Sequence, residues 1–202
     1  KNGFVFLGPL FAHQWNMLTL SQALLVFLAF CSMASAVYIM NDLVDIEADR
    51  AHPIKRHRPL PSGDLTVGRA RQLLVSLLVA SLILSLLVSG TVVLCIIAYF
   101  VINIFYSWRL KHVVILDVFL ISAGFMLRIL AGTSGLDIAP SSWLLLCGLM
   151  VTLFLGFAKR RAELLVLENC TADRNLTRRV LDDYSPAMLE QFIAVTAACT
   201  IL

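Results

Sequence analysis

The sequence predicts an all-α, polytopic membrane protein in which transmembrane helices form one bundle. Of the 202 residues, 59% are hydrophobic and only 14% are charged, and the mean hydropathy is +0.86. Soluble domains average about 45–50% apolar and about 25% charged residues, so the composition excludes a water-soluble globule. Long uncharged stretches alternate with short charged connections, as in chains that cross a bilayer repeatedly. The net charge of +3 is too small for a nucleic-acid-binding protein.

The first predicted spans lie in the uncharged sequence before Asp42. Residues 3–11 are apolar but contain Gly8-Pro9, which suits the remaining part of an earlier helix. Residues 18–40 rise by about 1.5 Å each, so they are long enough to cross a hydrocarbon core of about 30 Å. We therefore expect a partial span followed by a complete one.

The middle of the chain predicts three further spans. Residues 72–108 carry no charge and are longer than one crossing requires, and Ser89-Gly90-Thr91 near their middle is a turn signal. Two helices joined by a tight hairpin follow from this pattern. Residues 113–131 form another span, interrupted by Asp117 and Arg128.

The last part of the chain predicts one complete span and the beginning of another. A loop rich in Gly, Ser and Pro at residues 132–142 leads into the uncharged residues 138–158, and a final helix starts near Pro186. Asp182 to Tyr184 mark that helix start and are expected to lie outside the functional site. The total is five complete spans with a partial span at each end. We expect residues 1–202 to be a single transmembrane domain truncated at its N- and C-termini.

The basic residues gather in three connections that alternate crossings place on one side of the membrane. These connections are residues 50–71, 109–111 and 159–179. The opposite connections, near His13, near Ser89 and at residues 132–142, contain no Lys or Arg. The positive-inside rule assigns the basic side to the cytoplasm. This asymmetry predicts either a site for anions on that face or loops that merely set the topology.

An acidic cluster follows the first complete span and consists of Asn41, Asp42, Asp45 and Asp49. We expect the cluster to continue the helical register of the span, so that these side chains share one stripe at about 100° per residue. Carboxylates at such spacings destabilise a helix unless a cation lies between them. Hard oxygen ligands suit Mg²⁺, which binds substrate phosphates through one or two carboxylates. We predict that all four residues bind Mg²⁺ and that the three aspartates are catalytic, the alternative being a solvated acidic helix end.

A basic loop with prolines at 53, 59 and 61 follows the acidic cluster directly. The prolines stiffen the loop, and its cations project next to the aspartates. Lys and Arg beside a metal site neutralise the oxygens of a bound diphosphate. We therefore predict that Lys55 and Arg58 bind a diphosphate, and that Thr66 caps the next helix.

The segment from Tyr38 to Gly63 resembles the first signature of the UbiA superfamily of intramembrane transferases. An NDxxDxxxD pattern from Asn41 to Asp49 is followed by HPxKxxRPxxxG. The resemblance implies a helical bundle around a central cavity, in which the first aspartate motif holds Mg²⁺ and the diphosphate of a donor. This chain would then lack the first few residues and roughly the last third of such a bundle.

Residues 156–163 are basic where most UbiA prenyltransferases carry a second aspartate motif. In this departure the sequence is similar to the decaprenyl-phosphate phosphoribosyltransferase branch, whose donor is 5-phosphoribosyl 1-diphosphate (PRPP). The resemblance implies that Lys111, Lys159 and Arg160 bind the 5-phosphate, and that Asp117 positions a ribose hydroxyl or Lys111. It also extends to Tyr106 and Arg128 as substrate-binding residues, although Arg128 equally suits a structural pairing between helices.

The resemblance implies Mg²⁺-dependent transfer of a 5-phosphoribosyl group from PRPP to a polyprenyl phosphate in a bacterial plasma membrane. One alternative is a UbiA-type prenyltransferase that acts on an aromatic acceptor, which leaves the basic second site unexplained. Another is a transporter of phosphorylated lipids or anions, for which aligned carboxylates are poor ligands. A metal requirement for diphosphate release separates the two enzymes from the transporter.

Overall fold

The computed structural model describes residues 1–51, 55–108, 110, 113–169 and 184–201. Every regular element in this part of the chain is helical, as the sequence predicts. The elements are η1 (Asn2–Phe6), α1 (Leu7–Phe11), α2 (Met17–Val44), α3 (Ile46–Ala51), η2 (Lys55–His57), α4 (Pro59–Ser62), α5 (Val67–Leu86), α6 (Gly90–Trp108), α7 (Leu116–Gly132), η4 (Ser134–Leu136), α8 (Ser142–Asn169) and α9 (Pro186–Ile201).

Five of the described helices are long and apolar enough to cross a membrane, which confirms the five predicted complete spans. They are α2, α5, α6, α7 with its extension to Leu136, and α8 up to Leu165. The shorter apolar helices at residues 2–11 and 186–201 lie where partial spans are expected. The chain is an integral multi-pass membrane protein.

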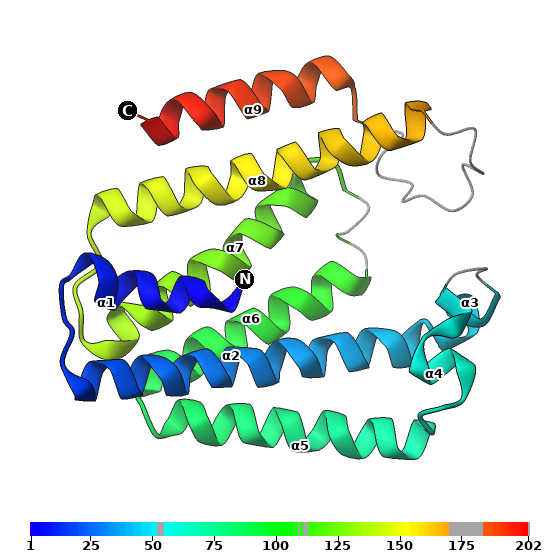
Figure 1. The fold of residues 1–202 in the computed structure, drawn as a ribbon, viewed down its shortest axis with the longest axis horizontal. Helices are drawn as coiled ribbons and strands as arrows, with labels where there is room; N and C mark the ends of the chain where they lie inside the picture. Colours follow the sequence, from blue (N-terminus) through cyan, green and yellow to red (C-terminus); the bar gives the residue numbers. More distant parts are fainter. Residues whose placement is uncertain (52–54, 109, 111–112, 170–183, 202) are drawn as a thin grey trace.

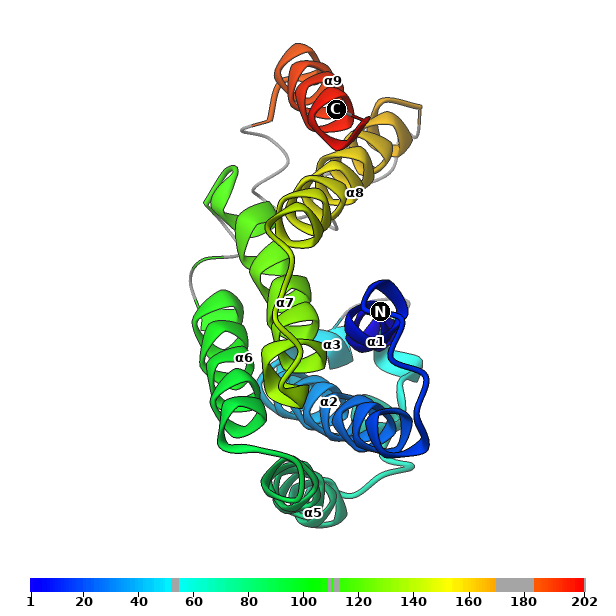
Figure 2. The same ribbon diagram turned by 90° about the vertical axis from the view of Figure 1, so that its left-hand side faces the viewer.

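The spans form a curved stack that Figure 2 shows almost end-on. α5 lies at one edge against α2, α6 and α7 follow, and α8 and α9 lie at the other edge. One apolar core joins α2, α6 and α7, and a second joins α7, α8 and α9. α7 contributes to both cores, so its position decides how the two halves of the stack meet.

Two predicted local features are confirmed at the ends of α5. The hydroxyl of Thr66 accepts the N–H of Arg69 at 3.4 Å, so Thr66 caps this helix. At the other end, the hairpin turn between Leu86 and Gly90 is held by Ser89, whose hydroxyl donates to the carbonyl of Gly135 at 2.7 Å.

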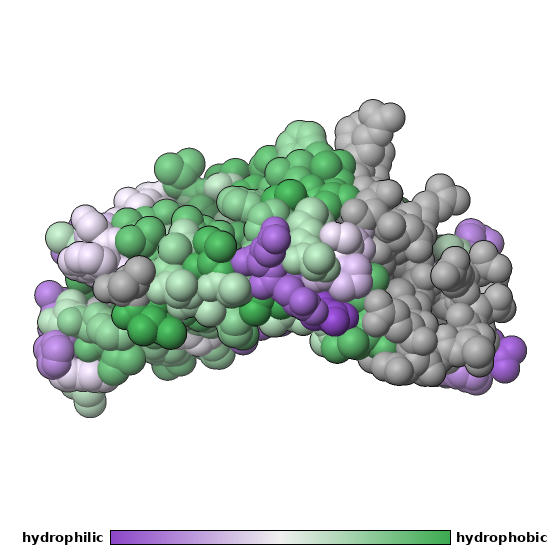
Figure 3. Space-filling model, turned by 90° about the horizontal axis from the view of Figure 1, so that it is seen from above, coloured by the Kyte–Doolittle hydropathy of each residue, from purple (hydrophilic) through white to green (hydrophobic). Residues whose placement is uncertain are grey.

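The outer surface of the spans is apolar, as contact with lipid requires. α5 carries Val75, Val79, Ile83 and Leu86 as exposed side chains. Seen from the α8 and α9 side, hydrophobic residues cover most of the described surface, and hydrophilic residues gather near the middle and at the two ends (Figure 3). This pattern is the inverse of that of a soluble protein, because apolar side chains cover most of the exterior.

Small residues on α8 allow this helix to approach α7 closely. A Cβ on Gly156 would lie 2.5 Å from Cγ1 of Val118, and one on Gly148 would lie 2.7 Å from Cδ1 of Ile129. Thr152, buried between the two glycines, completes a row of small residues at four-residue spacing. Such rows mark close helix contacts in membranes. Arg160 follows one turn later on the same row. This close contact between the two helices, the α7 to α8 seam, therefore places the side chain of Arg160 against α7.

The described residues next to the connections rich in basic residues lie at one end of the bundle. α2 and α6 end there, α5 and α7 begin there, and the same end holds the C-terminal end of α8 and the start of α9 (Figure 1). The turns after α1, between α5 and α6, and between α7 and α8 lie at the opposite end. The structure therefore agrees with the predicted alternate crossings.

Candidate functional site

The acidic motif begins where the first long helix is interrupted. α2 ends at Val44 and α3 starts at Ile46, with Asp45 between them at φ −91° and ψ 8°. The prediction of one uninterrupted helix is wrong at this residue. Repulsion among carboxylates three and four residues apart, together with the low helix propensity of Asp, disfavours a regular helix here.

Arg58 supplies the cation that the clustered aspartates need. Its Nη1 donates to Oδ1 of Asp42 and to Oδ2 of Asp49, both at 3.1 Å. Nζ of Lys55 lies 3.6 Å from Oδ1 of Asp49, whose side chain is buried. The structure thus brings four of the predicted site residues together across the bend formed by α3, η2 and α4.

The other two residues of the predicted metal site lie differently. Asp45 is exposed and Asn41 is half-buried. Among the described residues, no three His, Cys, Asp or Glu side chains come together as a metal-binding group. The structure thus groups Asp42 and Asp49 around Arg58, and the assignment of Asn41 and Asp45 to the metal site stays a prediction.

The chemistry of this donor set nevertheless fits Mg²⁺. Two aspartate oxygens already share one cationic nitrogen, so a positive charge between them is the arrangement that the structure stabilises. Mg²⁺ typically binds through one or two carboxylates and completes its shell with water and substrate phosphate. Asp42 and Asp49 are thus the residues best placed to hold it.

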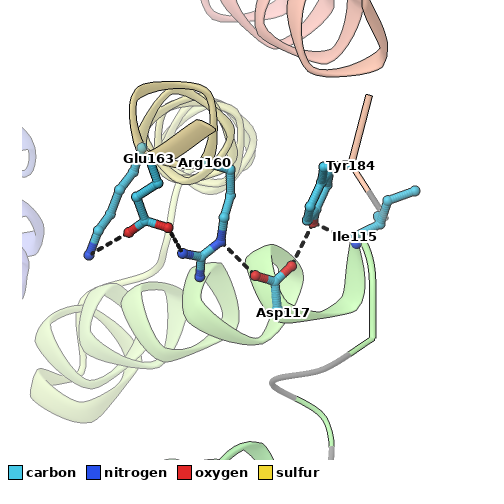
Figure 4. A network of polar contacts seen from close by, with 6 residues as sticks. Ile115, Asp117, Arg160, Glu163 and Tyr184 are labelled. Atoms are coloured by element: carbon cyan, nitrogen blue, oxygen red, sulfur yellow. Dashed lines mark hydrogen bonds and ion pairs between the residues drawn. The ribbon is translucent and has the colours of Figure 1, made fainter. Parts of the chain in front are cut away.

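A second polar cluster lies between α7 and α8. Nε of Arg160 donates to Oδ2 of Asp117 at 2.7 Å, and both side chains are almost completely buried. Nη1 of Arg160 donates to Oε2 of Glu163 at 2.6 Å, and Nζ of Lys159 lies 3.9 Å from Oε1 of that carboxylate. Figure 4 shows Arg160 lying between the two carboxylates. Each buried charge is thereby paired, as burial requires.

Tyr184 completes this cluster from the segment before α9. Its hydroxyl donates to Oδ1 of Asp117 at 2.6 Å and accepts the backbone N–H of Ile115 at 2.7 Å (Figure 4). Burial, and secondly the hydrogen bond to Asp117, raises the pKa of Tyr184. The hydroxyl therefore remains protonated at physiological pH and acts as a donor to the carboxylate.

Ile115, which Tyr184 holds, is the strained residue at the start of α7. Its φ of +69° lies in a region that β-branched residues rarely adopt. The N–H of Leu116 donates to the carbonyl of Val114 at 2.7 Å, which closes a three-residue turn around Ile115. Tyr184 thus links two connections at the basic end, and it places Asp117 in the first turn of α7 by holding the backbone before it.

Arg128 lies apart from both clusters, in the interior of α7. Its guanidinium donates to Oδ1 of Asn2 at 2.8 Å and to the carbonyl of Gly124 at 2.5 Å. It also lies over three aromatic rings, with its Cζ 4.6 Å from the centroid of Tyr99, 5.2 Å from that of Phe30 and 5.6 Å from that of Phe125. These contacts favour the structural role that the sequence left open.

Two further predicted site residues take part in neither cluster as described, and two residues of the second cluster were not predicted. Tyr106 is half-buried near the end of α6, and Lys111 lies outside the described residues. Glu163 was not predicted as a site residue, although its position three residues after Arg160 on one helix is a signal for pairing. The sequence around Tyr184 contains no such signal, because its partner Asp117 is 67 residues away.

The chain is similar to decaprenyl-phosphate phosphoribosyltransferases. It is 38% identical to that of Corynebacterium glutamicum over 207 residues, which cover 100% of this chain and 61% of the relative. It is 35% identical to that of Mycolicibacterium smegmatis, over 87% of this chain and 54% of the relative, and 32% identical to that of Mycobacterium tuberculosis, over 100% and 68%. The chain thus spans less than two thirds of the first two relatives.

Solved structures show the same fold at lower sequence identity. A UbiA homolog from Archaeoglobus fulgidus bound to DMAPP and Mg²⁺ matches with a TM-score of 0.74 and 18% identity, over 98% of this chain and 68% of that one. A digeranylgeranylglyceryl phosphate synthase matches with a TM-score of 0.71 and 20% identity, over 98% and 67%. The model of the UbiA prenyltransferase family matches residues 3–165. Fold, aspartate motif and family match agree, and the chain belongs to the UbiA prenyltransferase family.

Proposed function

We propose that the protein transfers a 5-phosphoribosyl group from PRPP to a polyprenyl phosphate and releases diphosphate. The observation that carries this proposal is the 38% identity to a decaprenyl-phosphate phosphoribosyltransferase over the whole of this chain. The charge pattern supports it, because an aspartate cluster and a separate cluster containing Lys159 and Arg160 lie at the same end of the bundle. A donor with a diphosphate and a second phosphate requires two such anion-binding places.

The aspartate cluster is proposed to receive the diphosphate of the donor. Asp42 and Asp49 would hold Mg²⁺, with Asn41 and Asp45 as further oxygen ligands, and Mg²⁺ would withdraw charge from the leaving diphosphate. Arg58 lies beside both aspartates and Lys55 beside Asp49, and these two cations would neutralise the remaining phosphate charge. Arg58 must then exchange its aspartate partners for phosphate oxygens.

Loss of the diphosphate gives C1 of the ribose oxocarbenium character, and the acceptor phosphate attacks this carbon. The acceptor is already an anion, so no general base is needed to activate it. Attack opposite the leaving group predicts inversion at C1. The polyprenyl chain lies in the bilayer, which explains why two phosphorylated substrates meet in a membrane protein.

The orientation of the site follows from the same charges. We propose that the basic end faces the cytoplasm of a bacterial cell, because the described connections at the opposite end carry no Lys or Arg. Water-soluble PRPP would then reach the site from the compartment that the basic connections face.

The test uses the natural full-length protein in detergent with Mg²⁺. One assay supplies radiolabelled PRPP with a polyprenyl phosphate, and a parallel assay supplies a prenyl diphosphate with 4-hydroxybenzoate. Each is repeated with Asp49→Asn and with Glu47→Gln, a matched control on α3 whose carboxylate is exposed. We expect label to move from PRPP into lipid, a loss of about 10²-fold or more in Asp49→Asn, and normal transfer in Glu47→Gln.

Two results would contradict the proposal. A prenylated aromatic product without phosphoribosyl lipid would identify a prenyltransferase. If neither assay gives a product, and PRPP stays intact with and without chelator, the protein is not acting as either transferase. The transporter alternative would then be favoured.

A further inference from the structure

Arg160 has two carboxylate partners that differ in how firmly they are held. Asp117 is 0% exposed, and its second oxygen is bound by the hydroxyl of Tyr184. The side chain of Glu163 is 32% exposed and belongs to the same helix as Arg160. Breaking a buried, fully paired contact leaves an uncompensated charge, whereas a partly exposed carboxylate can turn into water. Asp117 is therefore a fixed partner and Glu163 an exchangeable one.

Glu163 lies where two cations converge. One of its oxygens accepts from Arg160 at 2.6 Å, and the other lies 3.9 Å from Nζ of Lys159, whose side chain is 63% exposed. Because an arginine and a lysine both pair with this carboxylate, its position favours an anion. A phosphate carries more charge and more acceptor oxygens than a carboxylate, so it makes stronger charge-assisted hydrogen bonds with the same groups.

We propose that Glu163 is an internal occupant of an anion site formed by Lys159 and Arg160, and that a substrate phosphate monoester displaces it. The site itself stands on these contacts, whereas its assignment to the 5-phosphate of PRPP rests on the proposed function. The acceptor also carries a phosphate monoester, so the shared ligand chemistry has two possible sources.

Asp117 and Tyr184 act in this proposal as positioning residues. Asp117 accepts from Nε of Arg160 on the buried side, Tyr184 holds the other oxygen of Asp117, and Nη1 of Arg160 faces the exchangeable carboxylate (Figure 4). The guanidinium can then change partner at Nη1 without moving its buried edge. A planar group with donors on two sides is suited to this task, and a lysine at 160 is not.

The experiment measures binding by isothermal titration calorimetry to the natural full-length protein in detergent, without divalent cations. Ribose 5-phosphate is the probe for the donor, and geranyl phosphate is the probe for the acceptor. Removing the internal carboxylate with Glu163→Gln should tighten binding of one probe by about two- to fivefold, which corresponds to loss of a partly exposed ion pair. Lys159→Met should weaken binding of the same probe.

Glu190→Gln is the matched control, because Glu190 is an exposed carboxylate that pairs with the neighbouring Arg161 at 3.0 Å. It should leave binding of both probes unchanged. Tighter binding of either probe in Glu163→Gln supports the exchange and identifies whether the donor or the acceptor uses the site. Unchanged or weaker binding of both probes overturns it.

Turnover separates this inference from the proposed function. If PRPP is the donor and ribose 5-phosphate is the probe that binds more tightly, Glu163→Gln should also lower the KM for PRPP; if geranyl phosphate is that probe, the KM for the polyprenyl phosphate should fall instead. Tighter binding of a probe in a protein that transfers no phosphoribosyl group would contradict the proposed function and leave the anion site standing. Phosphoribosyl transfer with no effect of Glu163→Gln on probe binding or KM would support the proposed function and overturn the exchange at Glu163.

Discussion

At the residue level, opposite charges neutralise each other within both polar clusters. Arg58 lies between Asp42 and Asp49, and Glu163 lies beside Lys159 and Arg160. The first pairing could be predicted from sequence, because closely spaced carboxylates require a nearby cation and the basic loop follows at once. The second depends partly on Asp117 and Tyr184, whose contacts with the cluster are made only when distant segments fold together.

Arg128 provides a prediction about a buried charge outside these clusters. Arg128→Lys keeps the charge but loses the planar group that lies over three rings and donates to Asn2. We expect a decrease of about 1–3 kcal/mol in stability, measured as a lower thermal unfolding midpoint in detergent. Arg69→Lys on the exposed start of α5 is the control and should unfold like the parent. Normal stability of Arg128→Lys with an increased KM for PRPP would instead indicate a substrate contact.

At the level of helices, hydropathy predicted the five spans but not their neighbours. Uncharged length sets where a helix crosses the membrane, since unpaired charges are costly in lipid. Which helices touch depends on shape, and the row Gly148, Thr152 and Gly156 is the sequence signal for close packing. That row does not specify α7 as the partner. The break at Asp45 was missed although the repulsion among the carboxylates was recognised, because the sequence does not show which carboxylates the cation pairs with; in the structure Arg58 pairs with Asp42 and Asp49.

The α7 to α8 seam supports a prediction that links packing to the site. Gly156→Val would place atoms into Val118, a stiff β-branched residue on α7. Overpacking of this kind costs about 1–3 kcal/mol, and it should also draw Arg160 away from Asp117. We expect a lower unfolding midpoint together with weaker ribose 5-phosphate binding. Gly68→Val, where a Cβ meets nothing within 4 Å, is the control. Equal stability of the two variants would show that the seam is not tightly packed.

At the level of the whole molecule, the fold gathers the polar clusters and the basic residues beside them at one end of the bundle. Both polar clusters and the Tyr184 link between connections lie there, while the described connections at the other end carry no Lys or Arg. The sequence predicted this separation because each crossing reverses the side of the membrane. It did not predict that the N-terminal segment reaches α7, where Asn2 accepts a hydrogen bond from Arg128, since that contact joins residues 126 positions apart.

The orientation of this polarised molecule can be measured by cysteine labelling in intact bacterial cells. Gln14→Cys and Arg56→Cys introduce exposed thiols at opposite ends of the bundle, in a full-length protein whose native cysteines are replaced by alanine. A membrane-impermeant maleimide should label Gln14→Cys in intact cells, and should label Arg56→Cys only after permeabilisation, because the basic end is retained on the cytoplasmic side. The cysteine-free parent controls for background. The reverse pattern would place both polar clusters outside the cell, where cytosolic PRPP does not reach them, and would exclude PRPP as the donor.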